Sequence, residues 1–150
     1  MVCMNQRTHL SGGCQATDCG YPLIMTTIPT ARLLPQALGV LTAVYSSAVV
    51  LSPRILAKPC KLTRADGSVA PEVATVIRAV GARDVASGLL LATAPYGPAR
   101  RGAVALRAAA DFGDATVFGL TLPGAATKLK VAGFAAAWGV LCAYSGRYAG

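Results

Sequence analysis

The sequence between Val73 and Leu122 contains no lysine, glutamate, glutamine or asparagine. Helices that face water use these four residues freely, because their long polar side chains solvate the outer surface. This stretch offers Val, Ala, Leu, Phe and Gly instead, and its only charged residues are arginines and aspartates. Such a segment lacks the side chains that cover a soluble helical bundle, so it predicts helices surrounded by lipid.

The composition extends this prediction to the whole chain. Hydrophobic residues make up 54% of the sequence and charged residues only 13%, about half of the roughly 25% found in soluble domains. A length of 150 residues fits a single domain. We therefore expect an all-α fold, namely a four-helix up-down transmembrane bundle over residues 31–150. A disordered, polar tail is expected over residues 1–30, because this segment has no hydrophobic periodicity.

Four apolar runs are long enough to cross a hydrocarbon core of roughly 30 Å at about 1.5 Å per residue. A cleaved signal peptide is the competing interpretation of the first run, but its length and the runs that follow favour a retained helix. Connections of roughly six to eight residues between the last three runs predict antiparallel neighbours. The expected helices are about 33–51, 71–94 (from Pro71 or Glu72), 102–122, and 129–144 or 129–148.

The basic residues lie mostly between the apolar runs rather than in a stripe with aromatic residues. There are 14 Lys and Arg against 6 Asp and Glu, which gives a net charge of +8. Cations beside apolar helices are typical of contact with anionic lipid headgroups and of the positive-inside rule. The expected partner is therefore the lipid bilayer and not nucleic acid, with the termini leaning toward the side outside the cytoplasm.

The five cysteines give no disulfide framework, because their number is odd and their spacing irregular. Cys14 and Cys19 with His9 fit zinc-ligand spacing poorly, so we expect no metal site and no cofactor. Met25 begins a short, mildly basic leader to the first apolar run. Translation from Met25 is a hypothesis that would make the upstream segment a start-site artefact.

The third expected helix carries three charged residues on one face. At 100° per residue, Arg107, Asp111 and Asp114 fall within about 60° of one another, and Thr121 continues the stripe. An ionised residue in the middle of a membrane costs roughly 2.5–3.5 kcal/mol on insertion scales. These side chains are therefore expected to face the interior of the bundle, although Arg107 is expected near enough to the helix end to reach the interface.

The second expected helix supplies the partners. Gly81, Asp84 and Gly88 share one face, where the glycines would let a neighbouring helix approach closely. Arg78 borders this face near the helix end, whereas Arg83 is expected to point away, toward the first or the fourth helix. Over both helices three arginines balance three aspartates, which predicts a self-neutralising buried network.

These motifs carry a resemblance. The pattern Gly81-x-Arg83-Asp84-x3-Gly88, followed by Arg107-x3-Asp111-x2-Asp114, resembles a family of small four-helix membrane proteins of bacteria and fungi that is distantly similar to the DoxX-like group. The resemblance covers about residues 34–144. It implies a four-helix membrane fold but no activity, and the expected location is a bacterial plasma membrane or a fungal endomembrane.

Three functions remain open for the network. It can fix the register of the helices and nothing more. It can belong to a membrane-embedded acid–base enzyme, an isomerase or cyclase acting on a lipophilic small molecule, with Asp84, Asp111 and Asp114 as candidate acids and bases. It can also relay protons in a transporter; four short helices rarely enclose a pathway, so that account predicts a homo-oligomer.

Overall fold

The computed structural model describes residues 30–150, and there it is all-helical apart from one isolated bridge between Thr63 and Val69. Residues 1–29, which hold most of the expected tail and the Met25 start, lie outside the described residues. The elements, in chain order, are η1 (Thr30–Leu33), α1 (Leu34–Leu51), α2 (Arg54–Ala57), α3 (Pro71–Thr93), α4 (Pro98–Thr121), α5 (Ala125–Ser145) and η2 (Gly146–Tyr148).

The connections after α3 and α4 are shorter than expected. They comprise residues 94–97 and 122–124, because α4 begins at Pro98 rather than at residue 102 and α5 at Ala125 rather than at 129. A proline in the first turn of a helix loses no hydrogen bond, so it starts α4 instead of separating the helices. Gly97 and Gly124 have φ angles of 111° and 75°, a backbone region that glycine enters without a steric penalty.

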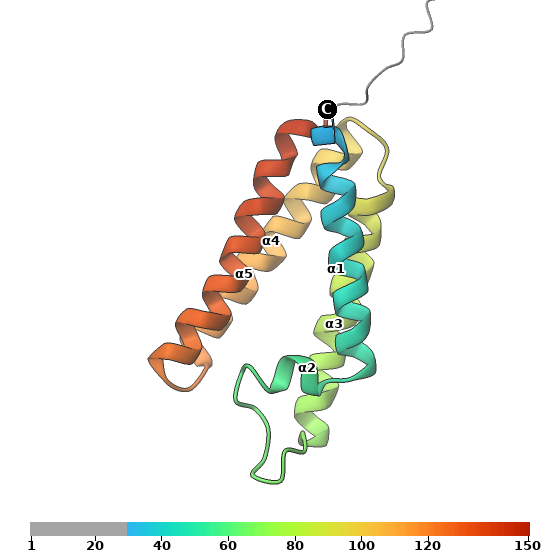
Figure 1. Ribbon diagram of the computed structural model, residues 1–150. Coiled ribbons are helices and arrows are strands. Elements are labelled where there is room, and N and C mark those ends of the chain that lie inside the picture. The colour runs from blue at the N-terminus through green and yellow to red at the C-terminus, as the bar shows by residue number, and fades with distance from the viewer. Residues whose placement is uncertain (1–29) are drawn as a thin grey trace, which may run out of the picture.

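The four long helices form two hairpins, with α1 packed on α3 and α4 packed on α5. Successive long helices run in opposite directions, and the hairpins diverge from the end at which the chain terminates (Figure 1). The contact between α3 and α4 is much smaller than the contacts within either hairpin. The architecture is therefore two tight helix pairs with little contact between them along most of their length, rather than four equivalent helices around one core.

Two glycines bring α1 and α3 into backbone contact. A Cβ atom built on Gly88 would lie 2.8 Å from the backbone nitrogen of Ala43, and one on Gly39 would lie 2.5 Å from that of Ala92. A Cβ on Gly81 would meet the Val50 side chain at 2.8 Å. Small residues at such crossings allow dense packing without long side chains, which explains the tightness of this hairpin.

The hairpins are joined firmly at one end. Arg100 is buried and donates from Nε and Nη2 to the carbonyl oxygen of Ala94, at 3.0 and 2.9 Å. The amide of Gly97 donates to the carbonyl oxygen of Ala149 at 2.8 Å. A cluster of buried apolar residues fills the same end: Leu38, Leu91, Ala94, Ala103, Val104, Ala108, Cys142 and Ala149.

The segment between α1 and α3 covers the opposite end of the first hairpin. It contains the short helix α2, which packs on both α1 and α3 and buries Ala57 completely. Its four residues are too few to produce a hydrophobic period, so the sequence did not predict it. Val49, Ala57 and Ile77 form a second, smaller apolar cluster there.

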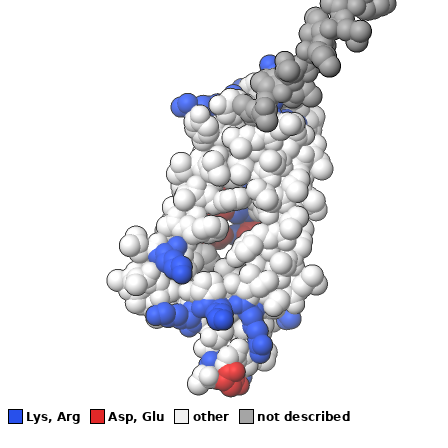
Figure 2. Space-filling model, in the orientation of Figure 1, with Lys and Arg blue, Asp and Glu red and all other residues white. Residues whose placement is uncertain are grey.

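On the face seen in Figure 2, the outer surface around the middle carries no charged residues, and Lys and Arg gather toward both ends. Large apolar side chains are exposed on every long helix, including Val44, Val76, Leu106 and Val140. Two helical segments, Leu34–Leu51 and Ala125–Tyr148, are long and apolar enough to cross a membrane. The other two long helices, α3 and α4, carry charged residues along their length, including Arg83 and Asp84 in α3 and Arg107 and Asp111 in α4.

Candidate functional site

Arg107 is the centre of a network of charged residues between the two hairpins. Its Nε donates to Oδ2 of Asp111 at 3.0 Å, and its Nη2 pairs with Oδ1 of the same carboxylate. Its Nη1 donates to Oδ1 of Asp84 at 2.8 Å and to Oγ of Ser87 at 2.9 Å. Arg107 therefore holds α4 to α3 while it makes a bidentate pair within α4, the strongest geometry for an arginine and a carboxylate.

The Arg107–Asp111 pair is sealed from the surface. The side chains are 2% and 6% exposed, so the expectation that Arg107 reaches the membrane interface is wrong. Because α4 starts at Pro98, Arg107 lies about two and a half turns inside the helix, where its guanidinium hydrogen-bonds to α3. Both oxygens of Asp111 accept from Arg107, and Arg107 also donates to Asp84 and Ser87 on α3.

Arg83 makes the second half of the network. Its Nη2 donates to Oδ2 of Asp114 at 2.6 Å, and its Nη2 and Nε donate to Oδ1 of Asp84 at 2.9 and 3.1 Å. The expectation that Arg83 points away toward the first or fourth helix is therefore wrong. Its side chain, which is 45% exposed, is long enough to reach Asp84 beside it on α3 and Asp114 across the seam on α4.

Two residues that the sequence assigned to the network lie outside it. Arg78 donates to the carbonyl oxygen of Val50 at 3.3 Å, and Thr121 donates to that of Val117 at 2.7 Å. Both side chains satisfy backbone carbonyls close to helix ends. The network thus comprises Arg83, Arg107, Asp84, Asp111 and Asp114, and its fully ionised charge is −1 rather than zero.

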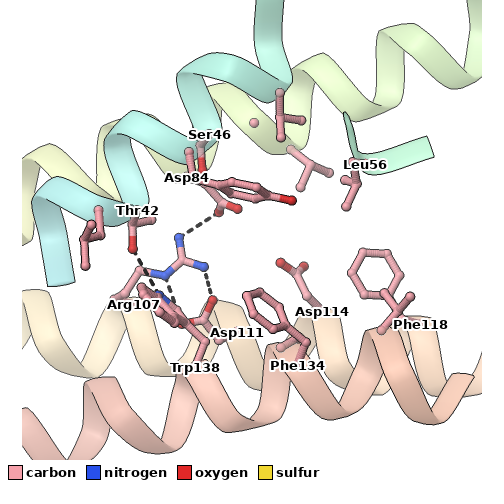
Figure 3. A pocket seen from close by; sticks show the side chains of 17 residues that line it. Thr42, Ser46, Leu56, Asp84, Arg107, Asp111, Asp114, Phe118, Phe134 and Trp138 are labelled. Atoms are coloured by element: carbon pink, nitrogen blue, oxygen red, sulfur yellow. Dashed lines mark hydrogen bonds and ion pairs between the residues drawn. The ribbon is translucent and has the colours of Figure 1, made fainter. Parts of the chain in front are cut away.

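Four members of the network, Asp84, Arg107, Asp111 and Asp114, form one wall of a cavity of about 290 Å³ between the hairpins (Figure 3). This volume is roughly twice that of an apolar cavity (~150 Å³) that accommodates benzene. The remaining walls are mainly aliphatic and aromatic, and the aromatic side chains are Tyr45, Phe118, Phe134 and Trp138. The space is therefore suited to an apolar molecule that carries one polar group.

The cavity opens at mid-height of the molecule. Figure 2 shows a hollow between the hairpins in which atoms of acidic and basic residues are visible, surrounded by uncharged surface. A molecule that enters by this opening passes the apolar middle of the protein and not its basic ends.

Asp84 and Asp114 each bring to the cavity one carboxylate oxygen that is not paired with an arginine. Their side chains are 16% and 18% exposed, and both residues line the cavity. Within residues 30–150, the arginines occupy Oδ1 of Asp84 and Oδ2 of Asp114, while the second oxygen of each carboxylate accepts no hydrogen bond from the protein. These two oxygens are available to a bound molecule.

Three polar residues of the site were not predicted. Trp138 lines the cavity and donates from Nε1 to Oγ1 of Thr42 at 3.1 Å. Ser87 accepts from Arg107. A single tryptophan in an Ala- and Gly-rich helix was the available signal for Trp138, whereas isolated Ser and Thr residues in apolar helices gave none.

No group of three His, Cys, Asp or Glu residues within the described range is arranged to hold a metal ion. The carboxylates of the network are occupied by guanidinium groups. The arrangement offers acid–base and hydrogen-bonding chemistry from the carboxyl groups themselves.

Comparison of the chain with protein-family models, with curated protein sequences and with solved structures finds no match.

Proposed function

We propose that this chain is an integral membrane protein whose four long helices cross the bilayer in alternating directions. The apolar middle of its surface, the exposed cations at both ends and the charges between the hairpins support this proposal. In lipid, charged side chains are stable only when they face the interior and pair with one another. The resemblance to small four-helix membrane proteins belongs to the same proposal.

Cysteine labelling tests the membrane topology. In intact vesicles that hold the protein in one orientation, a membrane-impermeant maleimide is expected to label Lys58→Cys or Arg101→Cys but not both, since these exposed residues lie near opposite ends. Leu106→Cys, exposed in the apolar middle, should stay unlabelled until detergent is added. Labelling of all three positions in intact vesicles would contradict the proposal.

The protein into which these cysteines are introduced keeps two native cysteines, Cys60 in the α2–α3 connection and Cys142 in α5. Cys60 is buried, and burial raises the pKa of its thiol, so little reactive thiolate forms at neutral pH. Cys142 is also buried. Replacing Cys3, Cys14 and Cys19 with serine therefore leaves the introduced cysteine as the dominant target.

Within this membrane fold we propose a protein that binds a lipophilic small molecule and acts on it by proton transfer. The observation that carries the proposal is the division of the network. All three aspartates line the cavity, but both oxygens of Asp111 pair with Arg107, as a register device requires, whereas Asp84 and Asp114 each keep one oxygen that accepts no hydrogen bond within residues 30–150. A carboxylate oxygen without a protein partner at the wall of an apolar cavity suits a bound molecule that donates a hydrogen bond, so a ligand gives this arrangement a purpose.

The charge of the network indicates the chemistry. Three carboxyl groups face two guanidiniums, so the network holds one carboxyl group more than its arginines pair with one to one. Asp114, with one arginine partner, is the candidate acid, and Asp84, with two, is the candidate base. A proton moved from Asp114 to one atom of a substrate, and another taken by Asp84, gives an isomerisation that needs no redox partner. Asp84 then loses its proton to solvent and Asp114 regains one, since both side chains are partly exposed.

A lipophilic β,γ-unsaturated ketone tests this chemistry, because its conjugated isomer forms by one proton transfer in and one out. Wild-type protein in detergent is expected to accelerate the conversion, followed by ultraviolet absorbance. Asp114→Asn is expected to reduce the rate about 10²-fold or more. Asp66→Asn, which changes an exposed carboxylate in the α2–α3 connection, is the matched control and should keep the wild-type rate.

Fluorescence of Trp138, the only tryptophan in the chain, reports in the same experiment whether the ketone occupies the cavity. Retained occupancy with lost conversion in Asp114→Asn places Asp114 in the chemistry. An occupied wild-type cavity without conversion would contradict the acid–base function, and an unoccupied cavity would contradict the binding function.

A further inference from the structure

A second cavity of about 340 Å³ adjoins the first. It lies between the α2 region, the beginning of α3 and α4, and its lining is almost entirely apolar, with Glu72 at the start of α3 as the charged exception. Residues found only in this cavity include Val73, Val76 and Ile77 of α3, and Cys60 and Leu62 of the connection after α2.

Three side chains line both cavities: Leu56, Val80 and Phe118. They come from α2, α3 and α4, so the boundary between the cavities is made of apolar side chains rather than backbone. Leu56 and Phe118 lie on the side of the first cavity away from Arg107 (Figure 3). The two spaces therefore follow one another, with the charged network on one side of this boundary and the second cavity on the other.

From this arrangement we infer that the ligand is a single-chain lipophile. Its head group lies at Asp84 and Asp114, and its hydrocarbon tail passes Leu56 and Phe118 into the second cavity. This inference rests on the proposed function and specifies its substrate class. Along α3, Asp84 and Val73 are eleven residues apart, which corresponds to about 16 Å, a length that a compact molecule does not span.

The network also limits the head group. Its carboxyl groups already outnumber its guanidiniums by three to two, so a carboxylate head group would add a negative charge that no arginine of the network compensates in a site of low dielectric. A carboxylate head group is therefore disfavoured. An amine suits the two free carboxylate oxygens as a hydrogen-bond donor and, once protonated, as a cation beside the aromatic rings of Phe134 and Trp138.

Quenching of Trp138 fluorescence by alkylamines tests the inference. Wild-type protein in a fixed concentration of detergent is expected to bind dodecylamine at least tenfold more tightly than hexylamine, because each methylene taken out of water strengthens binding about fourfold before the competing uptake by micelles. Val73→Phe, which fills the second cavity, should lower this ratio about tenfold. Leu89→Phe, an exposed position of α3 outside both cavities, should leave it unchanged.

Val76→Phe provides a second blocking variant, since Val76 lines the same cavity but is 63% exposed and its replacement disturbs the core less. Equal binding of both amines by the wild type, or an unchanged ratio in the folded blocking variants, would overturn the inference. Failure of the proposed function has a different signature. In that case dodecanoate would bind as tightly as dodecylamine, and Asp114→Asn would bind the amine like the wild type.

Discussion

Replacing Arg107 with methionine is expected to lower the free energy of unfolding by about 3–5 kcal/mol. The guanidinium is 2% exposed and hydrogen-bonds to two carboxylates and a hydroxyl group. Methionine fills similar space but leaves Asp111 with a buried, uncompensated charge. Because this arginine also joins α4 to α3, the variant should lose its cooperative thermal transition in detergent or show a much lower Tm.

Two further variants separate charge from packing. Arg101→Met removes an exposed arginine from the same helix and should change the Tm little, since exposed charges away from a network contribute little. Arg107→Met combined with Asp111→Leu replaces the buried pair by apolar groups and should regain most of the lost stability. A Tm of Arg107→Met equal to that of Arg101→Met would show that the network does not hold the hairpins together.

The same substitution is expected to have opposite effects at two glycines. Gly39→Ala should destabilise the protein by about 1–3 kcal/mol, because its Cβ would lie 2.5 Å from the Ala92 nitrogen and 2.7 Å from the Gly88 carbonyl oxygen. The clash is with backbone, so it can be relieved only by separating α1 from α3. Gly113→Ala, where no atom lies within 4 Å, should stabilise helix α4 by about 0.5–1 kcal/mol.

Denaturant titration of Gly39→Ala and Gly113→Ala in the same detergent measures how each substitution changes the free energy of unfolding. Gly88→Ala should behave like Gly39→Ala, since its Cβ would lie 2.8 Å from the Ala43 nitrogen. If Gly39→Ala and Gly113→Ala shift stability in the same direction, the close contact between α1 and α3 is not present in the folded protein.

Hydrophobic run length and prolines were sufficient to predict four long helices, because these signals are local. The start of α4 was misplaced by four residues, since Pro98 was interpreted as separating two helices rather than as the first residue of the second. That error moved Arg107 toward a helix end in the prediction. Its burial follows once the helix starts at Pro98.

The site itself was only partly predictable. Helical spacing grouped Arg107, Asp111 and Asp114 correctly, because residues on one face of one helix are related by a fixed angle. Contacts between helices depend on the angle and rotation of each hairpin, which sequence spacing does not define. The reach of Arg83 to Asp114, the position of Trp138 and both cavities depend on these quantities.

Hydrogen bonds made by Gly97, Arg100 and Ala149 join the two hairpins at one end of the molecule, and this joint affects how a ligand would enter between them. Each hairpin is a stiff arm anchored at that joint, and the arms diverge toward the other end (Figure 1). A small swing of one arm widens the mouth between them while every helix keeps its internal hydrogen bonds. In the bilayer that we propose around this protein, a molecule dissolved among acyl chains would enter sideways by this mouth, without first crossing into water.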